Sequence, residues 1–111
     1  MANERKVLAY KKYFVEFLST LKENEVKKII YVIDMLKAGH RVSSKYVKFI
    51  RDGLFELRAE CDGNIFRVFF IFDDGNIVIL LNGFQKKTSK TPRKEIEQAL
   101  KLKKEYYENK Q

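Results

Sequence analysis

The pattern of hydrophobic and polar positions is clearest between residues 53 and 96, where it predicts three short strands joined by two tight turns. Residues 54–60 and 64–72 alternate, and each run has one apolar face. That shared face consists of Phe55, Leu57, Ala59, Phe66, Val68, Phe70 and Phe72. Asp62-Gly63 and Asp73-Asp74-Gly75 have the composition of hairpin turns. Residues 77–83 are almost continuously apolar, so we expect them to form the central strand of an antiparallel meander.

The residues before this stretch show the longer period of amphipathic helices. Four apolar side chains follow the i, i+3, i+4, i+7 spacing of one helical face: Phe14, Phe17, Leu18 and Leu21. A second helix is expected with Asn24 as its N-cap and Gly39 just beyond its end. The short link between them predicts an antiparallel helix pair that covers one face of the sheet. Residues 6–10 have a weak strand pattern that fits a sheet edge.

Residues 40–52 have no clean period and carry several cations, which leaves two interpretations open. The first is a solvated surface connection, with His40 in an exposed turn. The second is one wall of a nucleic-acid groove, where Lys48 contributes charge and Tyr46 or Phe49 stacks on a base.

The chain after the third strand is rich in lysine and leads into a last amphipathic helix. Thr91 is the expected N-cap of this helix and Pro92 its first residue. Arg93 and Lys94 follow at the helix N-terminus, where cations oppose the helix dipole. Because a helix N-terminus with basic neighbours binds phosphate readily, we interpret this stretch, which includes Lys90, as functional.

The composition fits one folded domain that spans residues 1–111. The chain is 45% hydrophobic and 14% aromatic, and its net charge of +8 favours a polyanionic partner. It has one cysteine and one histidine, which exclude an intrachain disulfide and a cysteine zinc site, and we expect neither a metal nor a cofactor. The first ten residues lack the apolar run of a signal peptide, and no segment approaches the roughly 20 apolar residues of a membrane span. We therefore expect a cytoplasmic protein with no membrane partner.

The second face of the predicted sheet is largely apolar, yet two neighbouring strands each place one arginine on it, Arg58 and Arg67. A charged group in such a setting costs free energy unless it is paired. One interpretation is a salt bridge from either arginine to Glu56 or Glu60. The other is a half-buried anion site, where guanidinium groups bind a phosphate through two parallel hydrogen bonds.

Several blocks of the sequence, taken in order, resemble one protein family. They are GLFELR, GNIFRVFF and IVILLNGFQKKTSKTPRKEIEQA, and they resemble the phage-derived HigB-like branch of the RelE/ParE toxin superfamily. The resemblance implies an α+β fold of the RelE type, in which two N-terminal helices pack on a small antiparallel sheet and a C-terminal helix follows. It also implies a toxin of a type II toxin–antitoxin pair that cleaves ribosome-bound mRNA. The implied partners are a cognate helix-turn-helix antitoxin, mRNA and the ribosome, and the free toxin is expected to be a monomer or weak dimer.

The same resemblance assigns roles to individual residues. Its basic catalytic site maps to Arg58, Arg67, Lys86 and Lys87. Arg58 and Arg67 would clamp the scissile phosphate, and a lysine whose pKa is lowered by neighbouring cations would transfer a proton. The RNA-binding residues would be Tyr46, Lys48, Phe84, Lys90, Arg93 and Lys94. The better-known RelE pattern has a catalytic tyrosine near the C-terminus, whereas Tyr106 and Tyr107 lie deep in the last helix, where packing explains them.

Two other functions compete with the endoribonuclease. One is a non-enzymatic toxin that binds a protein such as DNA gyrase, and the other is a basic nucleic-acid-binding module without toxicity. A compact basic pocket formed by Arg58, Arg67 and Lys86 favours cleavage of RNA over the gyrase-type function.

Overall fold

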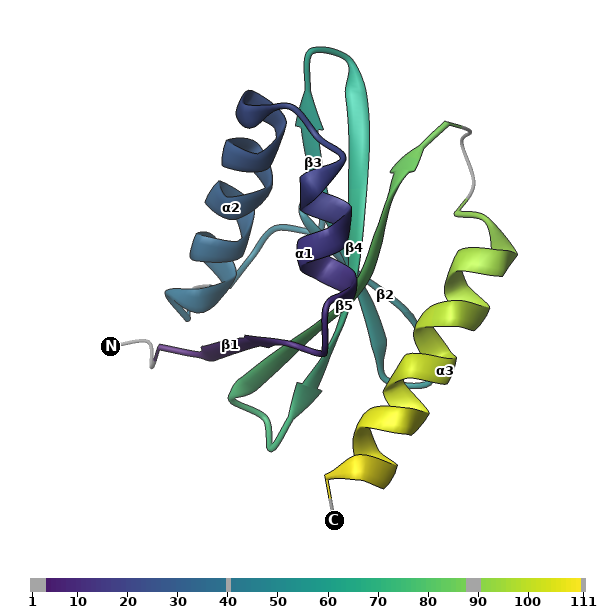
Figure 1. Ribbon diagram of the computed structural model, residues 1–111. Coiled ribbons are helices and arrows are strands. Elements are labelled where there is room, and N and C mark those ends of the chain that lie inside the picture. Colours follow the sequence, from purple (N-terminus) through teal and green to yellow (C-terminus); the bar gives the residue numbers. More distant parts are fainter. Residues whose placement is uncertain (1–3, 40, 88–90, 111) are drawn as a thin grey trace.

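The computed structural model describes residues 4–39, 41–87 and 91–110, which form an α+β fold with two helices before the main sheet and one after it (Figure 1). The α+β class is therefore confirmed. The elements are β1 (Lys6–Ala9), α1 (Tyr13–Ser19), α2 (Glu23–Lys37), β2 (Val47–Arg51), β3 (Leu54–Cys61), β4 (Asn64–Asp73), β5 (Ile77–Lys86) and α3 (Arg93–Asn109).

The sheet has the strand order β1-β5-β4-β3-β2. Strands β2 to β5 form the antiparallel meander, and β1 adds in parallel to β5 at the edge. The prediction that residues 77–83 form the central strand is wrong, because β4 occupies the middle of the sheet. Strand β5 is almost continuously apolar because it is covered on both faces, by α1 on one and α3 on the other.

The sequence pattern predicts no strand at β2, whose five residues lie in the stretch that it leaves as a surface connection or a groove wall. It pairs antiparallel with β3 at the second edge, with an irregular register between Phe49 and Arg51. An edge strand packs against one neighbour only, and most β2 side chains are exposed. The alternation that would reveal a half-buried strand is therefore weak in this stretch of sequence.

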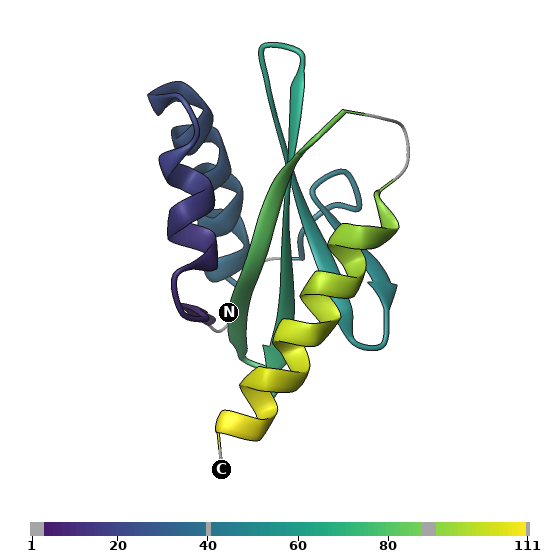
Figure 2. The same ribbon diagram turned by 45° about the vertical axis from the view of Figure 1, so that its right-hand side comes forward.

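The helices form a layer on each side of the sheet (Figures 1 and 2). We call the face covered by α1 and α2 the first face, and the face covered by α3 the second face. The first face carries the predicted apolar side chains of β3 and β4, which pack with Phe14, Ile29 and Leu36. The second face carries Phe69 and Ile71, which pack with Leu102 of α3. The strand alternation predicted from the sequence is therefore correct on both faces.

Two predicted helix starts are displaced by one or two residues. Helix α2 begins at Glu23, and the backbone N–H of Lys22 is capped by the carboxylate of Glu25 at 2.8 Å. Asn24, the predicted N-cap, instead donates a hydrogen bond to Asp62 in the β3–β4 turn at 3.0 Å. Helix α3 begins at Arg93 with Pro92 as N-cap, so the Thr91 hydroxyl is left for another partner. Gly39 does follow α2 with a φ of 80°, as predicted.

None of the helices in the described residues is both long and apolar enough to cross a membrane.

Candidate nucleic-acid interface

The register of the sheet gathers basic side chains on the second face. Arg58 of β3 lies opposite Arg67 of β4, which lies opposite Phe84 of β5. Residues that lie directly opposite one another in antiparallel strands point to the same face. By the same rule, Lys86 shares this face because it pairs with Ile65, two residues before Arg67. Lys48 of β2 shares it because it pairs with Glu56, two residues before Arg58.

Four cations from four adjacent strands therefore surround one region of the second face. A cleft of about 330 Å³ opens there between the sheet and the start of α3. It is lined by Lys48, Phe49, Ile50, Glu56, Arg67, Lys86, Thr91 and Ile96, and we call it the basic cleft. A pocket with convergent positive charge is suited to a phosphate-bearing ligand.

An ion pair between Arg67 and Glu56 forms one wall of the basic cleft. Arg67 is 6% exposed and Glu56 is 1% exposed, and the guanidinium Nη1 donates to the carboxylate Oε1. The other carboxylate oxygen accepts a hydrogen bond from the Thr91 hydroxyl at 2.9 Å. Of the two interpretations left open for the arginines, Arg67 thus forms the salt bridge. Arg58 is half-buried and makes no ion pair within the described parts of the chain, so its charge remains available.

The surroundings shift the proton affinities of two cleft residues. The pKa of Lys86 lies below its ordinary value, because its ammonium is partly buried and is repelled by Arg67, Arg58 and Lys48. Glu56 opposes this shift by attracting the charge. The pKa of Arg67 is also lowered, first by burial, although an arginine stays protonated in any case. Among the cations of the cleft, Lys86 therefore has a lowered pKa and can still lose its proton, unlike an arginine.

The other predicted catalytic and phosphate-contacting residues lie outside the basic cleft. Lys87 is exposed and directly follows the end of β5. Arg93 and Lys94 are exposed in the first turn of α3, where Arg93 pairs with Glu97 at 3.1 Å. Lys90 and His40 lie outside the described residues.

Two of the predicted aromatic contacts, Phe84 and Tyr46, lie away from the basic cleft. The Phe84 ring is 8% exposed and stacks on Phe69 at 5.6 Å in the core beneath α3. Tyr46 packs with the core of the first face. Phe49 contributes to the lining, but its ring lies edge-on to Phe55, which belongs to the first face, at 5.3 Å. A base could reach Phe49 only at the outer edge of the sheet.

Sequence reasoning assigned no site role to Glu56 and Thr91. The sequence pattern marks Glu56 only as a salt-bridge partner and Thr91 only as a helix cap. The signal for Glu56 was its spacing, because residues 56 and 58 of one strand share a face. The contact between Thr91 and Glu56 joins residues 35 apart in sequence, and no local pattern reveals it.

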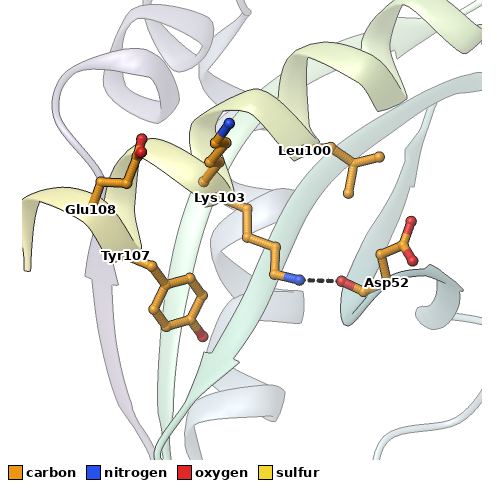
Figure 3. A pocket seen from close by; sticks show the side chains of 6 residues that line it. Asp52, Leu100, Lys103, Tyr107 and Glu108 are labelled. Atoms are coloured by element: carbon orange, nitrogen blue, oxygen red, sulfur yellow. Dashed lines mark hydrogen bonds between the residues drawn. The ribbon is translucent and has the colours of Figure 1, made fainter.

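A larger hollow of about 450 Å³ lies at the other end of α3 (Figure 3). Its lining combines two lysines, two carboxylate residues and two apolar side chains: Lys103, Lys104, Asp52, Glu108, Leu100 and Tyr107. The Lys103 ammonium is already bound to the backbone carbonyl of Asp52, and the charges on the rim are balanced. The side chains of Tyr106 and Tyr107 in this part of α3 bond to Asp73 and to the Phe72 carbonyl, which is consistent with packing. This hollow lacks the convergent charge of the basic cleft.

Within residues 4–39, 41–87 and 91–110, no group of three His, Cys, Asp or Glu side chains is arranged to hold a metal ion.

Comparison with known proteins identifies the family. The model of the family described as "Phage derived protein Gp49-like (DUF891)" matches residues 16–104, and the chain belongs to this family. Among solved structures, a chain of the archaeal RelE–RelB complex from Pyrococcus horikoshii OT3 is similar with a TM-score of 0.57 and 16% identity. The alignment covers 78% of this chain and 100% of that chain. No curated protein matches significantly. The Gp49-like family and the RelE-like fold confirm the resemblance to the RelE superfamily of toxins.

Proposed function

We propose that this protein is the toxin of a type II toxin–antitoxin pair and that it cleaves mRNA on the ribosome. One observation carries the proposal: Lys48, Arg67 and Lys86 line one cleft on the second face, and Arg58, which lies opposite Arg67, adds a fourth cation to the same face. Membership of the Gp49-like family and the RelE-like fold support it.

The proposed reaction uses the RNA's own 2′-hydroxyl as the nucleophile. Its oxygen attacks the adjacent phosphorus and loses its proton, the bond from phosphorus to the 5′ oxygen breaks, and the leaving oxygen takes up a proton. The products are a 2′,3′-cyclic phosphate and a 5′-hydroxyl. The protein must hold the two oxygens in line, stabilise the added charge on the phosphorane, and assist the proton transfers.

The basic cleft offers a group for each of these tasks. Lys48 lines the cleft with an exposed ammonium, and Arg58 on the same face makes no ion pair among the described residues, so both can neutralise the phosphate. Lys86, with its lowered pKa, can give or take a proton. Arg67 is held by Glu56, so we assign it to the positive potential of the wall rather than to a direct clamp. Lys87, Arg93 and Lys94 would contact the RNA outside the cleft, and Lys90, which the structure does not describe, is proposed as a further RNA contact.

The proposal includes a cognate antitoxin. The archaeal RelE-like structure was solved as a RelE–RelB complex. For this chain we propose an antitoxin with a helix-turn-helix DNA-binding domain, which would cover the basic surface while the pair is intact. The net charge of +8 favours an acidic covering segment.

Induced expression followed by mapping of mRNA 5′ ends tests the proposal. The wild-type chain should arrest growth and create new mRNA ends, and Arg58→Ala and Lys86→Met should reduce their number by about 10²–10⁴-fold if these groups act in the transition state. Lys27→Met is the matched control, because Lys27 is exposed on α2, on the other side of the sheet. Growth arrest without new ends would indicate a toxin that binds a protein such as DNA gyrase. If the wild-type chain causes no growth arrest and creates no new mRNA ends, the result would indicate a nucleic-acid-binding module without toxicity.

A further inference from the structure

The Glu56 carboxylate joins three elements of the basic cleft. It belongs to β3, its Oε1 binds Arg67 of β4, and its Oε2 binds Thr91 at the start of α3. With 1% of its surface exposed, Glu56 cannot itself bind a ligand. Its two oxygens are both engaged by neighbours that line the cleft.

Neither stability nor phosphate affinity explains this arrangement well. A buried ion pair is weak evidence for stability, because apolar residues of similar volume often serve as well or better. A carboxylate among four cations also lowers the positive potential that would attract phosphate. What a fixed carboxylate does supply is orientation, since it determines where the planar guanidinium of Arg67 lies.

We propose that Glu56 and Thr91 are positioning residues of the basic cleft: the Thr91 hydroxyl fixes the carboxylate, and the carboxylate fixes Arg67 in the cleft wall. The catalytic effect expected of this positioning rests on the function proposed above. The hydrogen bond from Thr91 to Glu56 also connects the residues just before α3 to the sheet. One hydroxyl therefore positions both the sheet side and the α3 side of the cleft. Small displacements of positioning groups have large kinetic effects, of up to about 10²-fold for 1 Å.

Glu56 has a second effect, on Lys86. The charged groups that face Lys86 are Arg67 on β4, Arg58 and Glu56 on β3, and Lys48 on β2. Glu56 alone among these raises the pKa of Lys86, and the other three lower it. Glu56→Gln should therefore lower the pKa of Lys86 further, and the limb of the pH–rate profile that reports Lys86 should move to lower pH.

The decisive experiment compares Thr91→Val with Thr91→Ser, because valine keeps the size of threonine and serine keeps the hydroxyl. We expect Thr91→Val to lower kcat on ribosome-bound mRNA by about 10–100-fold with little change in KM, and Thr91→Ser to restore it. Thr20→Val is the control, since the Thr20 hydroxyl donates to the Phe17 carbonyl at the end of α1, on the other side of the sheet from the basic cleft (Figure 2). A Thr91→Val variant as fast as wild type, or a Thr91→Ser variant as slow as Thr91→Val, would overturn the inference.

A measurement without cleavage separates this inference from the proposed function. In NMR spectra, the Nε–H signal of Arg67 should be slow to exchange in the wild type and in Thr91→Ser, because that N–H is buried. In Thr91→Val it should exchange faster, because Arg67 is less firmly held. If the wild type cleaves no RNA, the proposed function fails while this comparison still decides the positioning role. Equal exchange in all three proteins would refute the positioning role even if the wild type is active.

Discussion

Gly83 of β5 lies against the ring of Phe17 in α1, and replacing it with alanine tests how tightly the first-face core is packed. A Cβ at residue 83 would lie 2.4, 2.7 and 2.9 Å from three ring atoms of Phe17. Carbon atoms in good contact are about 3.5–4.0 Å apart, so the ring must withdraw by roughly 1 Å. Phe17 is half-buried and packs against the first-face core, so a withdrawal of its ring disturbs that packing. We expect Gly83→Ala to lower the free energy of unfolding by about 2–3 kcal/mol, the upper part of the range for overpacked cores.

Thermal and urea denaturation measure this effect, and a double-mutant cycle tests its cause. A loss of about 2 kcal/mol should lower Tm by roughly 9 °C in a domain of this size. Phe17→Ala has its own cost, but it removes the ring that the new methyl group meets. The double variant Gly83→Ala/Phe17→Ala should therefore lose less stability than the sum of the losses in the two single variants. The difference, the coupling free energy, should be about 1–3 kcal/mol. Losses that add to within about 0.5 kcal/mol would refute the proposed clash.

Three further predictions concern the second face. Asp73 accepts hydrogen bonds from Tyr106 and Lys110 and raises the pKa of Tyr106 to about 12, so Asp73→Asn should return that pKa toward about 10 in an ultraviolet titration of tyrosine ionisation. The pKa of Tyr106 is higher in the folded state than in the unfolded state, so its stabilising effect should be complete below about pH 10 and lost as pH rises through about 12. Unfolding curves of the wild type should show this loss, and those of Asp73→Asn should not. Leu102 of α3 is fully buried, so Leu102→Ala should lower the free energy of unfolding by about 2–5 kcal/mol in urea denaturation. Lys48→Ala should reduce the slope of log K against log salt for single-stranded RNA by about 0.7, and an unchanged slope would remove Lys48 from the interface.

The sequence predicted the elements whose environment differs between their two sides. Strand β3 alternates because its first face packs against α2, whereas its second face carries Glu56, Arg58 and Glu60. The helices were predicted from their apolar stripes. The edge strand β2 could not be predicted from the hydrophobic pattern because most of its side chains are exposed to solvent. The start of α2 was misplaced because Asn24 bonds to Asp62, which is distant in sequence, while the Glu25 carboxylate caps the helix. Local preference was overruled by a tertiary contact in that case.

The arginine pair of the basic cleft follows from one turn. Asp62 and Gly63 both have positive φ, of 51° and 81°, as a two-residue hairpin turn of this kind requires. Such a turn fixes the strand register, so Arg58 must lie opposite Arg67. The neighbourhood of these two residues was therefore available from the sequence. What the sequence could not decide is which carboxylate pairs with which arginine, because Glu56 and Glu60 both share their face.

The place of Lys86 depends on a feature that no local pattern reveals. From the β4–β5 turn as far as Phe70 and Leu80, the register would continue to pair Arg67 with Gly83. An irregularity between Val68 and Phe70 shifts the pairing by one, so that Arg67 meets Phe84 instead. A one-residue shift moves every later side chain to the other face of the sheet.

That shift brings Lys86 to the second face and turns Gly83 to the first. Without it, Lys86 would point toward the α1 and α2 layer, and Gly83 would face α3. The close approach of α1 at Gly83 and the lowered pKa of Lys86 in the basic cleft are thus two consequences of one irregularity in β5. Bulges of this kind are common next to functional sites, where they redirect a side chain. The tight packing at Gly83 therefore helps to keep the register that the proposed site requires.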